Sequence, residues 1–285
     1  MKDALIISAL SVVPKHAVSG WMGALARIRL PRPLLGWVIR SYCWKYNVDL
    51  SECEGSVQDY DSLVAFFTRP LRVGVRPVDG DPGAIVSPCD GKVYAIGTVV
   101  DDRIPQSDTQ HFSARELLAG REGYEGGHYA VIYLSPRDYH RVHTPLAGTV
   151  TRFQYVPGAL WPVFPAATRK IPFLFSRNER LTAFLDTELG EVAECLVGAF
   201  GVGRIRVVFS DVVSNNGGRD TVEREVNHPL GRAEEIGRFE MGSTVVLLFP
   251  PGSIRWTATP GQPVKLGERI AVRVGEAGGA PPEGA

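Results

Sequence analysis

Turn-forming residues recur along this chain too often to leave room for many long helices, with 31 glycines and 21 prolines among 285 residues. Glycine readily adopts positive φ angles and proline lacks a backbone N–H, so both residues interrupt regular structure. Past residue 80, the segments between them are short and rich in β-branched and aromatic residues, which is typical of strands. We predict strands at 92–100, 129–134, 148–156, 181–185, 203–209, 244–249 and 269–274.

Two of these strands follow turns with the same pattern, in which a glycine-containing turn leads into a strand: Ser87-Pro-Cys-Asp-Gly-Lys-Val and Thr144-Pro-Leu-Ala-Gly-Thr-Val. Residues 261–270 are similar to the turn of a lipoyl- or biotinyl-type barrel. The sequence therefore predicts an α+β fold, in which N-terminal amphipathic helices precede a mainly antiparallel β-barrel or sandwich core of lipoyl-like half-barrel repeats.

The overall composition excludes several classes of protein. Lys and Arg together number 31, as do Asp and Glu, so the formal net charge is zero. A chain without excess positive charge is not expected to bind nucleic acid through overall electrostatic attraction. No apolar run approaches the ~18 residues that a membrane-spanning helix needs. The cysteines form no Cys-x-x-Cys pair, so we expect free thiols in a reducing cytosol at Cys43, Cys53, Cys89 and Cys195.

Residues 1–50 combine seven basic residues with only two acidic ones, and they hold three of the five tryptophans: Trp21, Trp37 and Trp44. Apolar residues recur there at helical spacing, and Pro14, Pro31 and Pro33 divide the segment into short helices. Basic amphipathic helices that carry tryptophan are suited to a membrane interface. Two alternatives stay open: a helical cap packed on the protein's own core, and a signal-peptide core at residues 4–13.

Two histidines three residues apart, His140 and His143, form the first candidate for chemistry. Their spacing can bring two imidazoles into one cleft for acid–base work. The pair could also bind a metal or lie on the surface, and no third metal ligand is obvious nearby.

Asp90 and Ser243 become candidates only in combination with these histidines. An Asp-Gly pair is usually a turn, but a carboxylate can also orient an imidazole and stabilise its cation. Gly242-Ser243 directly precedes an apolar strand and can be an ordinary turn. A serine hydroxyl activated by histidine could also attack the carbonyl of the preceding glycine, given oxyanion donors.

A long segment rich in proline and aromatic residues, 155–180, ends in Arg177 and Arg180. It could form an apolar lid beside a phosphate or carboxylate site, or a structural loop whose arginines pair with acids.

Taken in order, the motifs resemble those of the bacterial phosphatidylserine decarboxylases, which depend on a pyruvoyl group. The resemblance runs from about residue 14 to residue 274. Its markers are Pro14-Lys-His-Ala-Val-Ser-Gly, Phe66-Phe-Thr-Arg-Pro-Leu-Arg, Ser87-Pro-Cys-Asp-Gly-Lys-Val, Asp138-Tyr-His-Arg-Val-His-Thr-Pro, Phe175-Ser-Arg-Asn-Glu-Arg and Met241-Gly-Ser-Thr. The family usually has leucine where this chain has Met241, an apolar exchange of similar volume.

The resemblance implies that the precursor cuts itself between Gly242 and Ser243. His143, oriented by Asp90, would deprotonate the Ser243 hydroxyl, and elimination and hydrolysis would leave a pyruvoyl group at residue 243. That ketone would act as the electron sink for decarboxylation of phosphatidylserine to phosphatidylethanolamine and CO2. His140 would be the acid that protonates the product carbon.

The resemblance also implies an organisation for the whole chain. Residues 1–75 would form a helical membrane-docking region, 76–274 a β-rich catalytic domain cut into chains 1–242 and 243–285, and 275–285 a disordered tail. The partners would be phosphatidylserine, an anionic membrane surface and a second copy of the protein, on the cytoplasmic face of the bacterial inner membrane. No nucleic acid is expected as a partner.

Two alternative functions remain. A lipoyl-like carrier or binding module would need Lys92 or Lys265 at a hairpin tip, and a zinc hydrolase would use the histidines with bound metal.

Overall fold

The computed structural model describes residues 14–201, 204–215, 217–240 and 243–275. It has an α+β fold in which short helices accompany mostly antiparallel sheets, as the sequence predicts. Residues 4–13, Gly242 and the tail beyond Gly275 lie outside this description. Within the described part of the chain, no helix is both long and apolar enough to cross a membrane.

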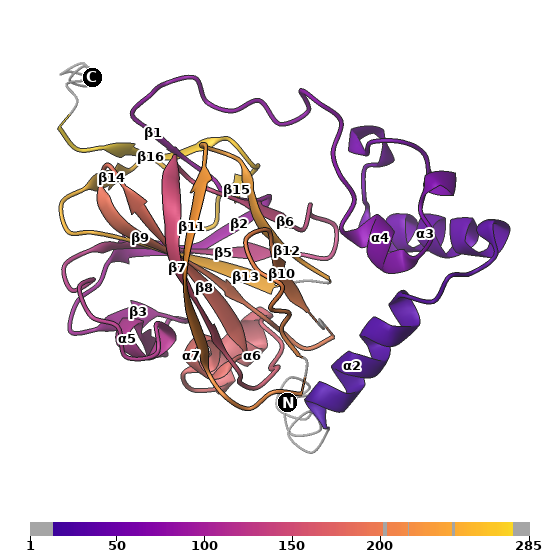
Figure 1. The fold of residues 1–285 in the computed structure, drawn as a ribbon, viewed down its shortest axis with the longest axis horizontal. Helices are drawn as coiled ribbons and strands as arrows, with labels where there is room; N and C mark the ends of the chain where they lie inside the picture. Colours follow the sequence, from indigo (N-terminus) through magenta and orange to yellow (C-terminus); the bar gives the residue numbers. More distant parts are fainter. Residues whose placement is uncertain (1–13, 202–203, 216, 241–242, 276–285) are drawn as a thin grey trace.

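Among the described residues, three N-terminal helices stand beside the strands, as Figure 1 shows in dark purple. They are α2 (Lys15–Ala26), α3 (Arg32–Tyr46) and α4 (Leu63–Phe67), with single 3-10 turns η1 (Leu50–Glu52) and η2 (Val57–Asp59) between α3 and α4. Pro14 and Pro31 precede α2 and α3, and Asn47 ends α3 in the left-handed conformation. Leu35, Ile39 and Phe66 belong to a small core of their own.

The largest sheet contains eight strands in the order β11-β7-β8-β9-β13-β5-β2-β15. The strands are β2 (Gly91–Thr98), β5 (His128–Leu134), β7 (Gly148–Val156), β8 (Arg180–Thr187), β9 (Gly190–Val197), β11 (Val222–Leu230), β13 (Ser243–Phe249) and β15 (Pro263–Val264). All neighbours pair antiparallel.

Strand β13 lies inside this sheet between β5 and β9, and both of its faces are buried. Val245, Leu247 and Phe249 belong to one hydrophobic core, whereas Val246 and Leu248 belong to the other. An uninterrupted apolar run is what a strand covered on both sides requires.

Three smaller sheets and three short helices complete the fold. One sheet pairs β10 (Ile205–Val207), β12 (Glu235–Phe239) and β6 (Arg141–His143), and another pairs β1 (Ala84–Val86), β16 (Arg269–Arg273) and β14 (Ile254–Trp256). The third is the hairpin of β3 (Arg103–Pro105) and β4 (His111–Ser113). Helices α5 (Ala114–Leu117), α6 (Pro165–Lys170) and α7 (Leu174–Arg177) contribute apolar residues to the second core.

The seven predicted strands are all present, with ends that differ by a few residues. Of the two predicted architectures, a barrel or a sandwich, the closed barrel is absent: the strands described here form open sheets, with β11 and β15 at opposite ends of the largest one. Closure needs two edge strands that pair along their length, and β15 has only two residues. The lipoyl-like repeats stay a prediction. All four cysteines are buried and free, as expected.

Glu194 is an unusual residue in this core. It lies in β9, where its backbone is opposite Ala183 of β8 and Leu247 of β13, and it is fully buried. Neither carboxyl oxygen has a hydrogen-bond partner among the described residues. Burial raises its pKa well above the ordinary value of 4.5, so the folded protein favours the neutral acid.

We expect Glu194→Met to stabilise the protein, by about 1–3 kcal/mol at pH 8, because it removes an unpaired buried polar group. The raised pKa means that native-state stability from this group is present below pH 4.5 and is lost as the pH rises. The gain should therefore be larger at pH 8 than at pH 5. Urea unfolding of chains that carry Ser243→Ala, and so stay in one piece, measures both values.

Glu225→Met is the matched control, because Glu225 is an exposed strand residue. Its effect should stay within about 0.5 kcal/mol at both pH values. A destabilised Glu194→Met variant would mean that this carboxyl group has a role in folding that its surroundings do not reveal.

Candidate active site

Three of the candidate residues lie on neighbouring elements: His140 directly precedes β6, His143 ends β6, and Ser243 begins β13, the strand that follows the β6 partner β12 along the chain. Asp90 directly precedes β2. Ser243, the first residue of β13, is paired with Leu134 at the end of β5. At the end of β12, four residues before the start of β13, the amide of Phe239 donates to the carbonyl of His140 at 3.0 Å. The stretch that contains the predicted cut is thus held between Leu134 on one side and His140 on the other.

His140 is fully buried, and its ring lies 4.0 Å from that of Phe67 between centroids. Its Nδ1 donates to the carbonyl of Asp138 at 2.8 Å, which leaves Nε2 as the unprotonated nitrogen. Within the described chain, Nε2 has no hydrogen-bond partner. Burial, with a smaller contribution from the charge of Arg69, lowers the pKa of His140 to about 3. The imidazole is therefore neutral and has a free acceptor.

His143 is held at both ring nitrogens. Nδ1 donates to the carbonyl of Ala233 at 2.9 Å, and Nε2 lies 3.1 Å from the hydroxyl of Tyr139, which donates to it. Burial lowers the pKa of His143, so this ring also favours the neutral form. The nitrogen that can accept a proton is Nε2.

Asp90 is buried in a network of opposite charge. Arg76 donates to it from Nε at 2.9 Å and from Nη2 at 2.6 Å, Lys265 contacts it at 3.2 Å, and the amide of Leu266 donates at 2.9 Å. Burial acts to raise the pKa of Asp90, but the bonds and charge of Arg76 outweigh it, and the pKa lies below 3.8. Asp90 is therefore ionised.

No hydrogen bond joins Asp90 to His143 among the described residues. The amide of His143 instead donates to the carbonyl of Pro88, two residues before Asp90, at 2.8 Å. The carboxylate thus acts on His143 through its charge, which favours the protonated ring. The direct orienting contact of Asp90 with His143 stays a prediction.

Sequence reasoning missed three members of this site: Tyr139, Ala233 and Arg76. Tyr139 precedes His143 by four residues within the same motif, so that motif contained the signal. No local pattern connects Ala233 to His143 or Arg76 to Asp90, because these pairs come from different parts of the fold.

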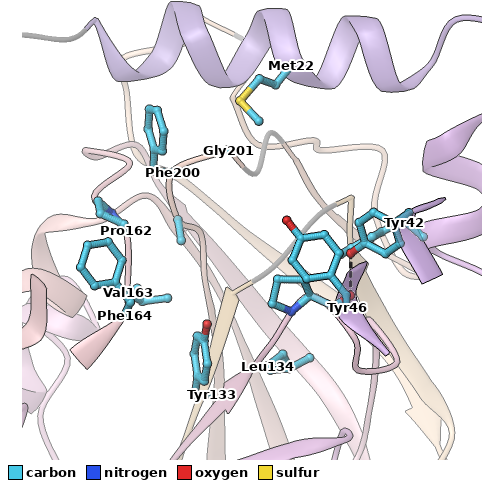
Figure 2. A pocket seen from close by; sticks show the side chains of 13 residues that line it. Met22, Tyr42, Tyr46, Tyr133, Leu134, Pro162, Val163, Phe164, Phe200 and Gly201 are labelled. Carbon is cyan, nitrogen blue, oxygen red and sulfur yellow. Dashed lines mark hydrogen bonds between the residues drawn. The ribbon is translucent and has the colours of Figure 1, made fainter. Parts of the chain in front are cut away.

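An apolar cavity of about 230 Å³ lies beside these residues. Leu134 and Phe67, the neighbours of Ser243 and His140, belong to its wall. Figure 2 shows Met22 of α2 over the cavity and Tyr42 and Tyr46 of α3 at its side. The cavity therefore lies between the N-terminal helices and the end of the large sheet, next to Leu134 and Phe67, which are the neighbours of Ser243 and His140.

The segment 155–180 has mainly a structural role at its end. Arg180 is buried and donates to carbonyl oxygens, including those of Leu117 at 2.5 Å and Ser176 at 2.6 Å. Arg177 is exposed at the end of α7. Arg180 thus has a structural role, but it binds backbone carbonyl oxygens and not the acidic side chains that the structural alternative predicted.

The two alternative functions find little support in the described residues. No group of three or more His, Cys, Asp or Glu side chains there is arranged to hold a metal ion. Lys92 lies within β2, paired with Tyr133 and Pro263, and Lys265 contacts Asp90. Neither lysine is at the free hairpin tip that a carrier module needs.

Comparison with known proteins agrees with the motifs. The sequence model of the family described as phosphatidylserine decarboxylase matches residues 63–272. The chain is 40% identical over 278 residues to a phosphatidylserine decarboxylase proenzyme of Myxococcus xanthus, covering 95% of this chain and 99% of the relative. Proenzymes of the same name from Bordetella petrii and an Anaeromyxobacter species are 41% and 42% identical, with 95% of this chain and 98% and 99% of each relative covered. The chain therefore belongs to the phosphatidylserine decarboxylase family.

Proposed function

We propose that this chain is a precursor that cuts itself between Gly242 and Ser243 and then decarboxylates phosphatidylserine with a pyruvoyl group derived from Ser243. The relatives are named proenzymes of this activity. The observation that carries the proposal is the place of Ser243: it begins a buried strand and is paired with Leu134, which lines an apolar cavity, and the preceding strand β12 ends at Phe239, which is bonded to the neutral His140.

For the self-cleavage, we assign the base to Nε2 of His143. Its Nδ1–H is engaged by the Ala233 carbonyl, so the lone pair is on Nε2, where a proton can be accepted. We expect the Tyr139 hydroxyl to yield this position to the hydroxyl of Ser243, which attacks the carbonyl of Gly242. The charge of ionised Asp90 stabilises the imidazolium that forms.

The surroundings of residue 243 fit a pyruvoyl group. The end of a strand that is paired on both sides is a rigid support, and the unpaired Nε2 of His140 is a buried acceptor without a partner in the described structure. The group would be held at the start of β13, and it would supply an electrophilic carbonyl for the amino group of the serine headgroup and an electron sink for the loss of CO2.

His140 supplies the proton transfers in this proposal. Its Nε2 can accept the proton that the headgroup ammonium must lose, because the negative charges of the bound headgroup favour the imidazolium. Burial disfavours the resulting imidazolium, so His140 readily returns the proton to the carbon that has lost CO2. The apolar cavity accommodates the uncharged part of the lipid near the headgroup.

We further propose that α2 and α3 dock the enzyme on a membrane. They expose large apolar side chains, and Trp21, Trp37 and Trp44 are 72%, 64% and 87% exposed. Arg32, Arg40 and Lys45 are exposed on α3 and suit anionic headgroups. Met22, Tyr42 and Tyr46 line the cavity, so a docked lipid has a short path to it. The site on the cytoplasmic face and the homodimer remain predictions of the family resemblance.

The self-cleavage predicts two polypeptides, 1–242 and 243–285, on a denaturing gel of the purified protein. Ser243→Ala should leave one intact chain, because it removes the attacking hydroxyl. Mass spectrometry should find the small chain about 17 mass units lighter than its serine-started mass, since conversion of an N-terminal serine to a pyruvoyl group removes one ammonia overall. Ser253→Ala, in the same small chain, should cleave like the wild type. Active protein that is one unbroken chain would overturn the proposal.

The two histidines should separate the two reactions. His140→Gln should still cleave but lose about 10²–10⁴-fold in kcat for decarboxylation, the usual contribution of a general acid–base group. His143→Gln should remain uncleaved. Gel analysis and CO2 release measure the two outcomes. A His140→Gln enzyme that is cleaved and fully active would remove His140 from the mechanism.

The docking surface should be visible in vesicle flotation. Combined Trp21→Ser and Trp37→Ser should weaken binding to phosphatidylserine-containing vesicles by at least about tenfold, because each large apolar side chain contributes roughly 1.5–3 kcal/mol when buried. Val100→Ser, at an exposed valine outside these helices, should bind like the wild type. Equal binding by the double variant would exclude α2 and α3 as the docking surface.

A further inference from the structure

Glu240 is the last described residue before the predicted cut, and its side chain is held by two arginines. Arg206 of β10 donates from Nε at 2.7 Å, and Arg27, which follows α2, donates from Nη2. The Glu240 side chain is only 7% exposed. Burial acts to raise its pKa, but the bonds from Arg27 and Arg206 prevail and keep the pKa low. Glu240 is therefore a buried carboxylate with two cationic partners.

The backbone around Glu240 is held as well. Its amide donates to the carbonyl of Arg204 at 2.8 Å, and Phe239 is paired with Ile205 and bonded to His140. On the other side of the predicted cut, Ser243 is paired with Leu134. Only residues 241 and 242 separate these two attachments, so a shift of Glu240 moves one end of a very short connection.

The charges around Glu240 make its carboxylate indispensable to this arrangement. Three guanidinium groups, those of Arg27, Arg204 and Arg206, act on it. Burial and then the charge of Arg27 lower the pKa of Arg204, which indicates crowding of like charges. Without Glu240, the three cations would repel one another and separate the end of α2 from β10.

We propose that Glu240 is a positioning residue for self-cleavage: its pairs with Arg27 and Arg206 hold the segment before the cut in register with Ser243. Arg27 directly follows α2. The Arg27–Glu240 pair therefore makes efficient cleavage depend also on how α2 packs against the sheet that contains β10. This inference rests on the proposed cut between Gly242 and Ser243, and it assigns Glu240 no contact with substrate.

The test is the rate at which chain 243–285 appears after a pulse of cell-free synthesis. Glu240→Gln should slow this step about 10–100-fold, since misplacement by about 1 Å is enough for such losses. Arg27→Gln and Arg206→Gln should each slow it in the same direction. Exchanging the charges, with Glu240→Lys and Arg206→Glu together, should restore part of the rate, which a general loss of packing would not allow.

Glu191→Gln is the matched control. Glu191 also binds two arginines, Arg121 and Arg152, but it lies in β9 at the hairpin with β8, away from the cut. Its cleavage rate should equal that of the wild type. Once Glu240→Gln protein has matured fully, its kcat should lie within about twofold of the wild-type value, because a positioning role in the cut ends with the cut, whereas KM can rise because Met22 of α2 lines the cavity.

The outcomes separate this inference from the proposed function. If neither the wild type nor any variant is cleaved, the proposed function fails. If the wild type is cleaved and Glu240→Gln matches its rate, only the role of Glu240 is overturned. A slow Glu240→Gln that the charge exchange does not improve would also overturn it, because the pairing of opposite charges would then not be what matters.

Discussion

The burial of β13 on both faces is the constraint on which the rest of this structure depends. Its side chains alternate between two hydrophobic cores, and its backbone is paired to β5 and β9. A strand held in this way cannot shift by one residue without turning each side chain to the opposite core. Ser243, at its first position, is therefore placed by the packing of the whole sheet. The same packing would hold the small chain in place after a cut before Ser243.

Burial also sets the chemical state of the groups around Ser243. His140 and His143 have lowered pKa values mainly because burial disfavours their cations, and backbone carbonyls select the protonated nitrogen in each ring. Asp90 remains ionised at a similar depth because Arg76 compensates for its burial. Two neutral imidazoles and one ionised carboxylate thus lie close together without any of them being exposed to bulk water.

The N-terminal helices combine two properties that rarely occur together on a simple structural cap. Their outer surface exposes tryptophans, while Met22, Tyr42 and Tyr46 line the cavity beside β5. The Arg27–Glu240 pair adds a direct ionic link between the end of α2 and the segment before Ser243. A change in the position of α2 would therefore reach both the cavity and the predicted cut.

The local sequence was enough to predict the strands, because the alternation of β-branched runs with glycine and proline reflects short-range backbone preferences. It was also enough to identify the candidate site residues, because the order of the motifs and the types of residue can be read directly from the sequence. These residues are His140, His143, Asp90 and Ser243. The sequence did not decide between a closed barrel and a sandwich, because closure depends on how long the edge strands are, and β15 is very short.

Only the tertiary structure decided which groups pair with which. Arg76 with Asp90, Ala233 with His143 and Arg27 with Glu240 join residues 14, 90 and 213 positions apart, so no periodicity in the chain links them. The sequence also did not predict that the buried carboxyl group of Glu194 has no hydrogen-bond partner among the described residues, or that a cavity lies between the N-terminal helices and the large sheet. Burial and pairing arise from contacts between distant segments, whereas residue type and backbone preference are local; the sequence alone determined the local properties.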